Sequence, residues 1–71
     1  MEELKKYSSV KDISINNTMI PKDTLIFIGN MVDKAQYGKK ADVFVDYEKI
    51  GTIGSYELDQ GLKYKLIKKE L

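Results

Sequence analysis

The apolar segment Leu25–Ile28 places the strongest constraint on how this chain can fold. Because successive side chains of a strand point to opposite faces, Leu25 and Phe27 would lie on one face and Ile26 and Ile28 on the other. Burying one such side chain is worth roughly 1.5–3 kcal/mol. A strand over this segment therefore needs apolar contacts on both of its faces.

The chain has little material with which to build those contacts. Its 71 residues are enough for one hydrophobic core, and we expect a single domain over residues 1–71. The chain contains no cysteine and no histidine, so we expect no disulfide, metal or cofactor to reinforce the core. A second molecule, either another copy of the chain or a larger protein, is the remaining source of stability.

Alternation of polar and apolar residues predicts a mainly β domain of about five antiparallel strands. Asp12–Asn16 alternates in this way, and Asn16-Asn17-Thr18 then favours a turn. Residues 41–71 favour a three-stranded meander, with strands over residues 42–46, 50–53 and 62–66. We expect an SH3-like, partly closed barrel or a curved sheet with one short helix, and an α+β sheet with helices on one side is the alternative.

Two short segments favour helix. Glu2–Tyr7 could form a helical turn, although a helix of that length is marginal in isolation. Asn30 stands at an N-cap position with Asp33 three residues later, which predicts a helix over Met31–Tyr37. The alternative continues the preceding strand and makes Asp33–Lys40 a hairpin loop.

The residues that most often carry catalysis are missing. Without histidine and cysteine, the serine–histidine and cysteine–histidine arrangements are excluded. Asp42, Asp46 and Glu48 could hold a hard cation, but a solvated acidic face is the simpler interpretation. Gly51 and Gly54 have the spacing of a nucleic-acid-binding G-x-x-G loop, yet they lie between β segments, where a bulge is the simpler interpretation. We therefore expect that the protein is not an enzyme.

The apolar strand favours a binding function. We expect a non-enzymatic small binding protein, either a homo-oligomer or a protein-interaction or inhibitor module. The alternative is that the N-terminal segment or the Met31–Tyr37 helix covers the second face within one chain. The residues expected at a protein interface are Leu25, Ile26, Phe27, Ile28 and Phe44.

Lysines interleaved with tyrosines support two further hypotheses. One is a single-stranded nucleic-acid-binding domain, in which Lys63, Lys65 and Lys69 share the outer face of the last strand and, with exposed tyrosines, contact backbone and bases. The other is a protein that sequesters a small ligand or nucleotide. The candidate residues for both are Tyr37, Lys39, Lys40, Tyr47, Lys49, Tyr56, Lys63, Lys65 and Lys69. Because every basic residue is lysine and the net charge is only +1, nucleic acid ranks below a protein partner.

Membrane insertion and export are not expected. The longest apolar run is far shorter than the roughly 20 residues that cross a bilayer. Residues 1–6 lack the basic and apolar regions of a signal peptide, so we expect a cytoplasmic protein. The bias toward Lys, Ile and Asn without Arg is typical of an AT-rich genome, such as that of a mobile element.

Overall fold

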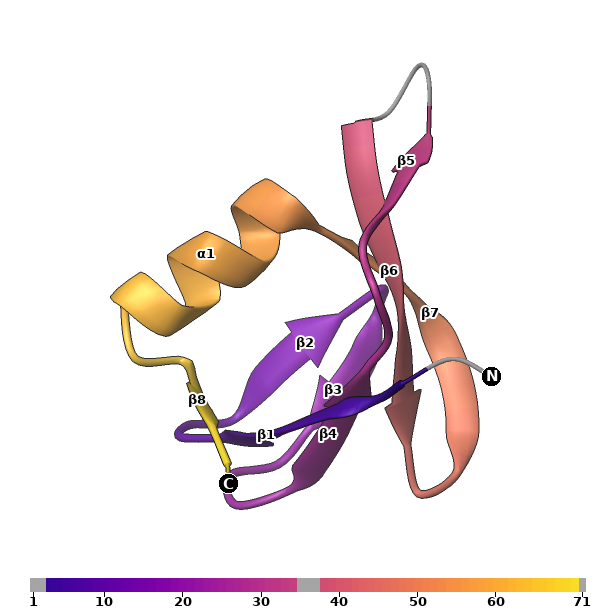
Figure 1. Ribbon diagram of the computed structural model, residues 1–71. Coiled ribbons are helices and arrows are strands. Elements are labelled where there is room, and N and C mark those ends of the chain that lie inside the picture. The colour runs from indigo at the N-terminus through magenta and orange to yellow at the C-terminus, as the bar shows by residue number, and fades with distance from the viewer. Residues whose placement is uncertain (1–2, 35–37, 71) are drawn as a thin grey trace.

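The computed structural model describes residues 3–34 and 38–70 and contains, within them, eight strands and one helix (Figure 1). The elements are β1 (Lys5–Ser9), β2 (Ile13–Ile15), β3 (Thr18–Ile20), β4 (Leu25–Ile28), β5 (Val32–Lys34), β6 (Gly38–Val45), β7 (Glu48–Gly54), α1 (Ser55–Lys63) and β8 (Ile67–Lys69). Every strand pair is antiparallel. The prediction of a mainly β, antiparallel fold with one short helix is confirmed.

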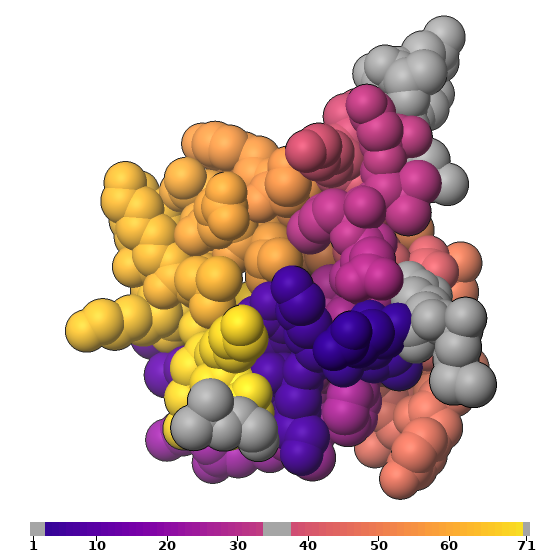
Figure 2. Space-filling view, in the orientation of Figure 1, coloured from indigo at the N-terminus to yellow at the C-terminus, as the bar shows by residue number. Residues whose placement is uncertain are grey.

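The larger sheet is open and has the strand order β8-β1-β4-β6-β7. β4 lies in its middle and pairs with β1 on one edge and with β6 on the other. β5 follows β4 along the same edge of β6. β5 and the start of β6 project beyond the rest of the molecule as an arm (Figures 1 and 2). Since β7 and β8 stand at opposite ends of this order and are not paired with each other within the described residues, the sheet does not close into a barrel.

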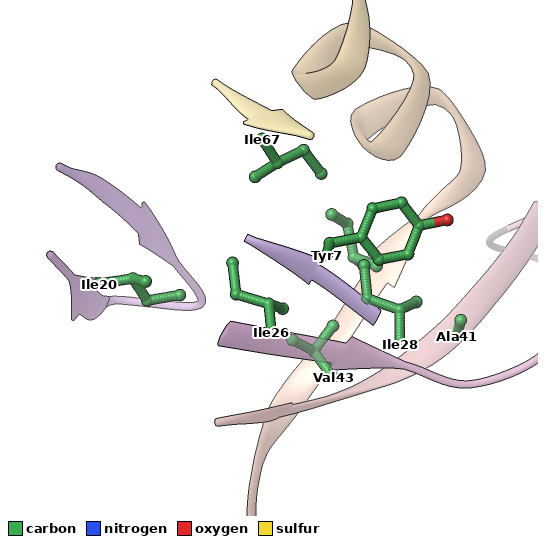
Figure 3. Packing of buried hydrophobic residues seen from close by; sticks show 8 residues of the cluster. Tyr7, Ile20, Ile26, Ile28, Ala41, Val43 and Ile67 are labelled. Carbon is green, nitrogen blue, oxygen red and sulfur yellow. The ribbon is translucent and has the colours of Figure 1, made fainter. Parts of the chain in front are cut away.

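The hydrophobic core lies on the inward face of β4. Ile26 is 0% exposed and Ile28 is 2% exposed, and both point toward Tyr7 of β1 and Ile67 of β8 (Figure 3). The buried cluster comprises Tyr7, Ile20, Ile26, Ile28, Ala41, Val43, Ile53 and Ile67. These residues come from six strands of the same chain, so this face of β4 is covered from within.

The side chain of Asn16 links the hairpin of β2 and β3 to the large sheet. Asn16 and Asn17 form its two-residue turn with φ values of 51° and 64°, a conformation that asparagine tolerates better than most residues. The Asn16 side-chain amide donates a hydrogen bond to the carbonyl of Thr52 in β7 at 2.7 Å. The contact holds Ile13, Ile15 and Ile20 of the hairpin over the core.

Gly51 makes room for this asparagine. It has a φ of 141° and lies where the β6–β7 register shifts, so the bulge interpretation is confirmed there. A Cβ atom at Gly51 would collide with the side chain of Asn16. Glycine is therefore required at this position both by the backbone and by the space available.

The position of the helix differs from the prediction. The helix spans Ser55–Lys63, so the expected third meander strand over residues 62–66 is wrong. Glu57 accepts a hydrogen bond from the backbone N–H of Gly54 at 3.2 Å, which helps to begin the helix. Leu58 packs against the core and Gly61 lies close against Ile67. The alternating apolar residues of 62–66 belong to the helix end and the following turn, which is why their period of two is misleading.

Two other predicted helical segments are strands in the described residues. Val32–Lys34 forms β5 against β6, so the helix over Met31–Tyr37 is wrong where the structure describes it; residues 35–37 lie outside the described residues. Lys5–Ser9 forms β1 instead of a helical turn. In both cases pairing with a neighbouring strand satisfies backbone groups that a short helix would leave open.

Ser9 organises the connection between β3 and β4. Its hydroxyl accepts a hydrogen bond from the N–H of Thr24 at 2.9 Å and donates one to the carbonyl of Pro21. Its backbone carbonyl accepts from the N–H of Asp23 at 2.9 Å. Ser9 is completely buried. Loss of its hydroxyl would leave the N–H of Thr24 without its partner, while the carbonyl of Pro21 would keep the hydrogen bond from the Thr24 hydroxyl at 2.7 Å.

We predict that Ser9→Ala lowers the free energy of unfolding by roughly 1–3 kcal/mol, because the Thr24 N–H loses its partner and the Pro21 carbonyl loses one of its two. Chemical denaturation measures this change. Ser14→Ala is the matched control, since Ser14 is exposed on β2. Equal stability of the two variants would contradict the assigned role of Ser9.

A second stability prediction compares two glycines that both have positive φ. We expect Gly51→Ala to destabilise the protein more than Gly38→Ala, because only Gly51 is crowded by a side chain, that of Asn16. Gly38→Ala should cost roughly 1–2 kcal/mol, the usual penalty for a left-handed backbone. Thermal unfolding of the two variants checks the order, and a less stable Gly38→Ala protein would reverse the conclusion.

Candidate functional site

The outward face of β4 carries apolar side chains that the chain does not bury. Leu25 is 48% exposed and Phe27 is half-buried. Phe27 pairs directly with Phe44 of β6, which is half-buried as well. Paired residues of an antiparallel sheet share a face, so the two rings form a cross-strand aromatic pair on the side away from the core.

Leu4 and Tyr47 extend this aromatic pair into a shallow groove. A hollow of about 210 Å³ is lined by Leu4, Phe27, Phe44 and Tyr47. Leu4 is 43% exposed. It precedes Lys6 by two residues and Ser8 by four, and these two lie opposite Phe27 and Leu25, so the alternation of the strand places Leu4 on the same outward face. We call Leu4, Leu25, Phe27, Phe44 and Tyr47 the outer patch.

Tyr47 occupies an unusual backbone position at the end of the groove. Asp46 and Tyr47 form the two-residue turn between β6 and β7 with φ values of 53° and 65°. Turns of this kind favour Asn-Gly or Asp-Gly, and an ordinary residue in the left-handed region costs roughly 1–2 kcal/mol. The Tyr47 side chain is 99% exposed, so contacts within the chain do not offset that cost. Backbone strain of this sort is concentrated at functional sites.

Both rims of the outer patch carry charges of both signs. Lys6 lies beside Phe27 and Lys49 lies beside Phe44 on the same face. The ammonium of Lys49 is 3.2 Å from the carboxylate of Asp42. On the other rim, Glu70 donates its backbone N–H to the carbonyl of Lys6 at 2.9 Å, and its carboxylate accepts from the Ser8 hydroxyl at 2.8 Å. The surface around the patch is therefore nearly balanced in charge.

The structure divides the five predicted interface residues between two faces. Leu25, Phe27 and Phe44 belong to the outer patch, whereas Ile26 and Ile28 lie in the core. The apolar strand thus uses one face for the core of its own chain. On its other face, the described residues do not bury Leu25 and Phe27 as completely as the core buries Ile26 and Ile28.

The predicted lysine and tyrosine set does not gather at one place. Lys63 ends α1 with its ammonium 5.6 Å from the ring centroid of Tyr64. Lys65 lies in the turn after the helix, and Lys69 lies in β8 opposite the buried Tyr7. The expectation that these three lysines share one strand face is therefore wrong. Of the remaining candidates, Lys39 and Lys40 lie in β6, Lys49 in β7, Tyr47 in the turn between them and Tyr56 on α1, while Tyr37 lies outside the described residues.

The acidic residues near the β6–β7 turn do not form a shared face. Asp42 is paired with Lys49, while Glu48 lies opposite Val45, whose side chain packs against the core. Within residues 3–34 and 38–70, carboxylates do not come together in a group of three or more that could hold a metal ion. The helix found in that part of the chain is too short and too polar to cross a membrane.

A second hollow, of about 150 Å³, lies between β2 and α1. Its apolar wall includes Ile13, Ile53 and Ile67. Two of its polar residues are already engaged, because Asn16 bonds to Thr52 and Glu57 bonds to Gly54. The hollow therefore offers few free polar groups with which to orient a ligand.

Sequence reasoning identified Leu25, Phe27 and Phe44 but missed Leu4 as their neighbour. The miss follows from the assignment of Glu2–Tyr7 to a helical turn. Read as a strand, the segment places Leu4 and Lys6 on one face and Lys5 and Tyr7 on the other. That alternation was the available signal.

Comparisons with protein-family models, with curated proteins and with solved structures found no match for this chain.

The two faces of β4 should respond differently to truncation. We predict that Ile26→Ala lowers the free energy of unfolding by roughly 2–5 kcal/mol, because it opens a cavity in the core. Leu25→Ala should cost well under half of that, since Leu25 is half-exposed. Chemical denaturation at the lowest workable protein concentration measures both values, and equal losses would show that Leu25 is buried in solution.

Proposed function

We propose that this protein is a non-enzymatic protein-interaction module that docks onto another protein surface through the outer patch. The observation that carries the proposal is the Phe27–Phe44 pair on the outward face of the sheet, next to the exposed Leu25. The partner surface belongs either to a second copy of the chain or to a larger protein, and contact with it buries the apolar side chains of the patch.

The composition of the patch supports docking. Interface centres are enriched in aromatic residues and poor in charge, and their rims are polar. Phe27, Phe44 and Tyr47 form such a centre, and Lys6 and Lys49 stand at its margins. Tyrosine in particular is frequent among the residues that dominate binding energy.

Charge favours a protein partner over a nucleic acid. A single-strand binder combines stacking aromatics with lysines that are free to contact phosphates. Here the Lys49 ammonium is 3.2 Å from the Asp42 carboxylate, and the other rim carries the carboxylate of Glu70. The aromatic pair therefore lies in a balanced surface, which attracts polyanions weakly.

Photo-cross-linking in the native host tests the proposal. We expect a chain carrying p-benzoylphenylalanine in place of Phe44 to give a light-dependent protein adduct of defined mass, because the ring would face the docked partner. The same probe in place of Tyr56, an exposed tyrosine on α1, is the matched control and should give none. Leu25→Asp combined with the Phe44 probe should abolish the adduct, since a charge in the patch centre opposes docking.

Three results would contradict the proposal. They are the absence of any adduct at the Phe44 position, identical adducts at both positions, or an adduct that nuclease removes. The last of these would favour the single-stranded nucleic-acid alternative instead.

A further inference from the structure

Tyr47 and the groove beside it are parts of the same patch. The tyrosine is 99% exposed and stands at the end of the hollow that Leu4, Phe27 and Phe44 line. A protruding aromatic side chain and a recess lined by aromatic residues are thus neighbours on one surface. Such a surface can be complementary to itself.

We infer that the partner of the outer patch is a second copy of this chain, with Tyr47 of each copy packed in the groove of the other. The inference rests on the proposed function and deepens it by naming the partner. Because the same patch serves both copies, a two-fold axis satisfies both grooves at once. The contact is therefore closed and produces a dimer, not a filament.

The area of the outer patch is close to what an interface between two copies of the chain needs. A tyrosine carries roughly 150–250 Å² of surface, and almost all of it is accessible at Tyr47. With the exposed parts of Leu4, Leu25 and the two phenylalanines, each copy offers on the order of 400 Å² of apolar surface. Two patches, extended by the lysine stems at their rims, approach the roughly 1,000 Å² at which a biological interface begins.

Charge complementarity points the same way. One rim holds Lys6 and the carboxylate of Glu70, which accepts a hydrogen bond from Ser8, and the other holds Lys49 paired with Asp42. A second copy brings the same charges of both signs, so either rim can meet an opposite charge. A surface with charge of one sign would repel its own copy.

Sedimentation of the wild type and of Tyr47→Gly tests the inference. We expect the wild type to move from the chain mass of 8.2 kDa toward twice that mass between about 1 μM and about 1 mM, the range of a small interface. Tyr47→Gly should weaken dimerisation tenfold or more. The variant should fold well, because glycine accepts the φ of 65° at this turn.

Two further measurements make the result specific. Tyr56→Ala, which removes an exposed tyrosine outside the patch, should leave dimerisation unchanged. In a mixture of isotope-labelled and unlabelled wild-type chains, intermolecular NOEs should connect the Tyr47 ring with Phe27 and Phe44. The melting midpoint of dilute Tyr47→Gly, equal to or above that of dilute wild type, confirms that lost dimerisation is not lost folding.

The outcomes separate this inference from the proposed function. A wild type that stays monomeric at about 1 mM, or a Tyr47→Gly chain that dimerises as tightly as the wild type, overturns the inference. If the Phe44 photo-probe then captures a larger protein, docking through the patch survives with a different partner. If the probe captures no protein, both the inference and the proposed function fail.

Discussion

The central position of β4 is the constraint on which the rest of the structure depends. The strand pairs with β1 on one edge and, at Phe27 and Ile28, with β6 on the other, so its two faces are what the rest of the chain has to cover. Ile26 and Ile28 supply the middle of the core. In a chain of 71 residues, the hairpin β2–β3 and the helix α1 are sufficient to enclose that one face. The other face remains with Leu25 and Phe27 at the surface.

Local patterns predicted the elements whose partners lie close along the chain. Alternation around Ile13 and Ile15 and the turn after it are confirmed as the β2–β3 hairpin. The hairpin predicted from residues 42–46 and 50–53 is confirmed as β6–β7, although its turn lies at Asp46-Tyr47 and not at residues 47–49. In both cases the period of two lies in neighbouring residues and agrees with the fold, and the turn chemistry agrees with it at Asn16-Asn17.

The elements that were predicted wrongly depend on distant partners. β1 is a strand because residues 25–28 and 67–69 lie on either side of it, and the segment Lys5–Ser9 itself does not specify them. The helix α1 forms where Leu58 can pack on the core and Gly61 can approach Ile67, whereas the nearby alternation of leucine and tyrosine favoured a strand. For the same reason, only part of the outer patch was predicted from the sequence. Phe27 and Phe44 were predicted from the excess of apolar residues, but Leu4 joins them only once β1 is placed in the sheet.

The pairing of β1 with β8 joins segments about sixty residues apart in the sequence, as in the register of Tyr7 with Lys69. Synthesis on the ribosome proceeds from the N-terminus, so β1 emerges long before the strand that completes its second edge. Until residues 67–69 leave the exit tunnel, that edge of β1 and the side of the core that Ile67 closes stay open to solvent. Such long-range closure is typical of slowly folding β proteins. The nascent chain therefore acquires its finished sheet only after translation has passed its last strand.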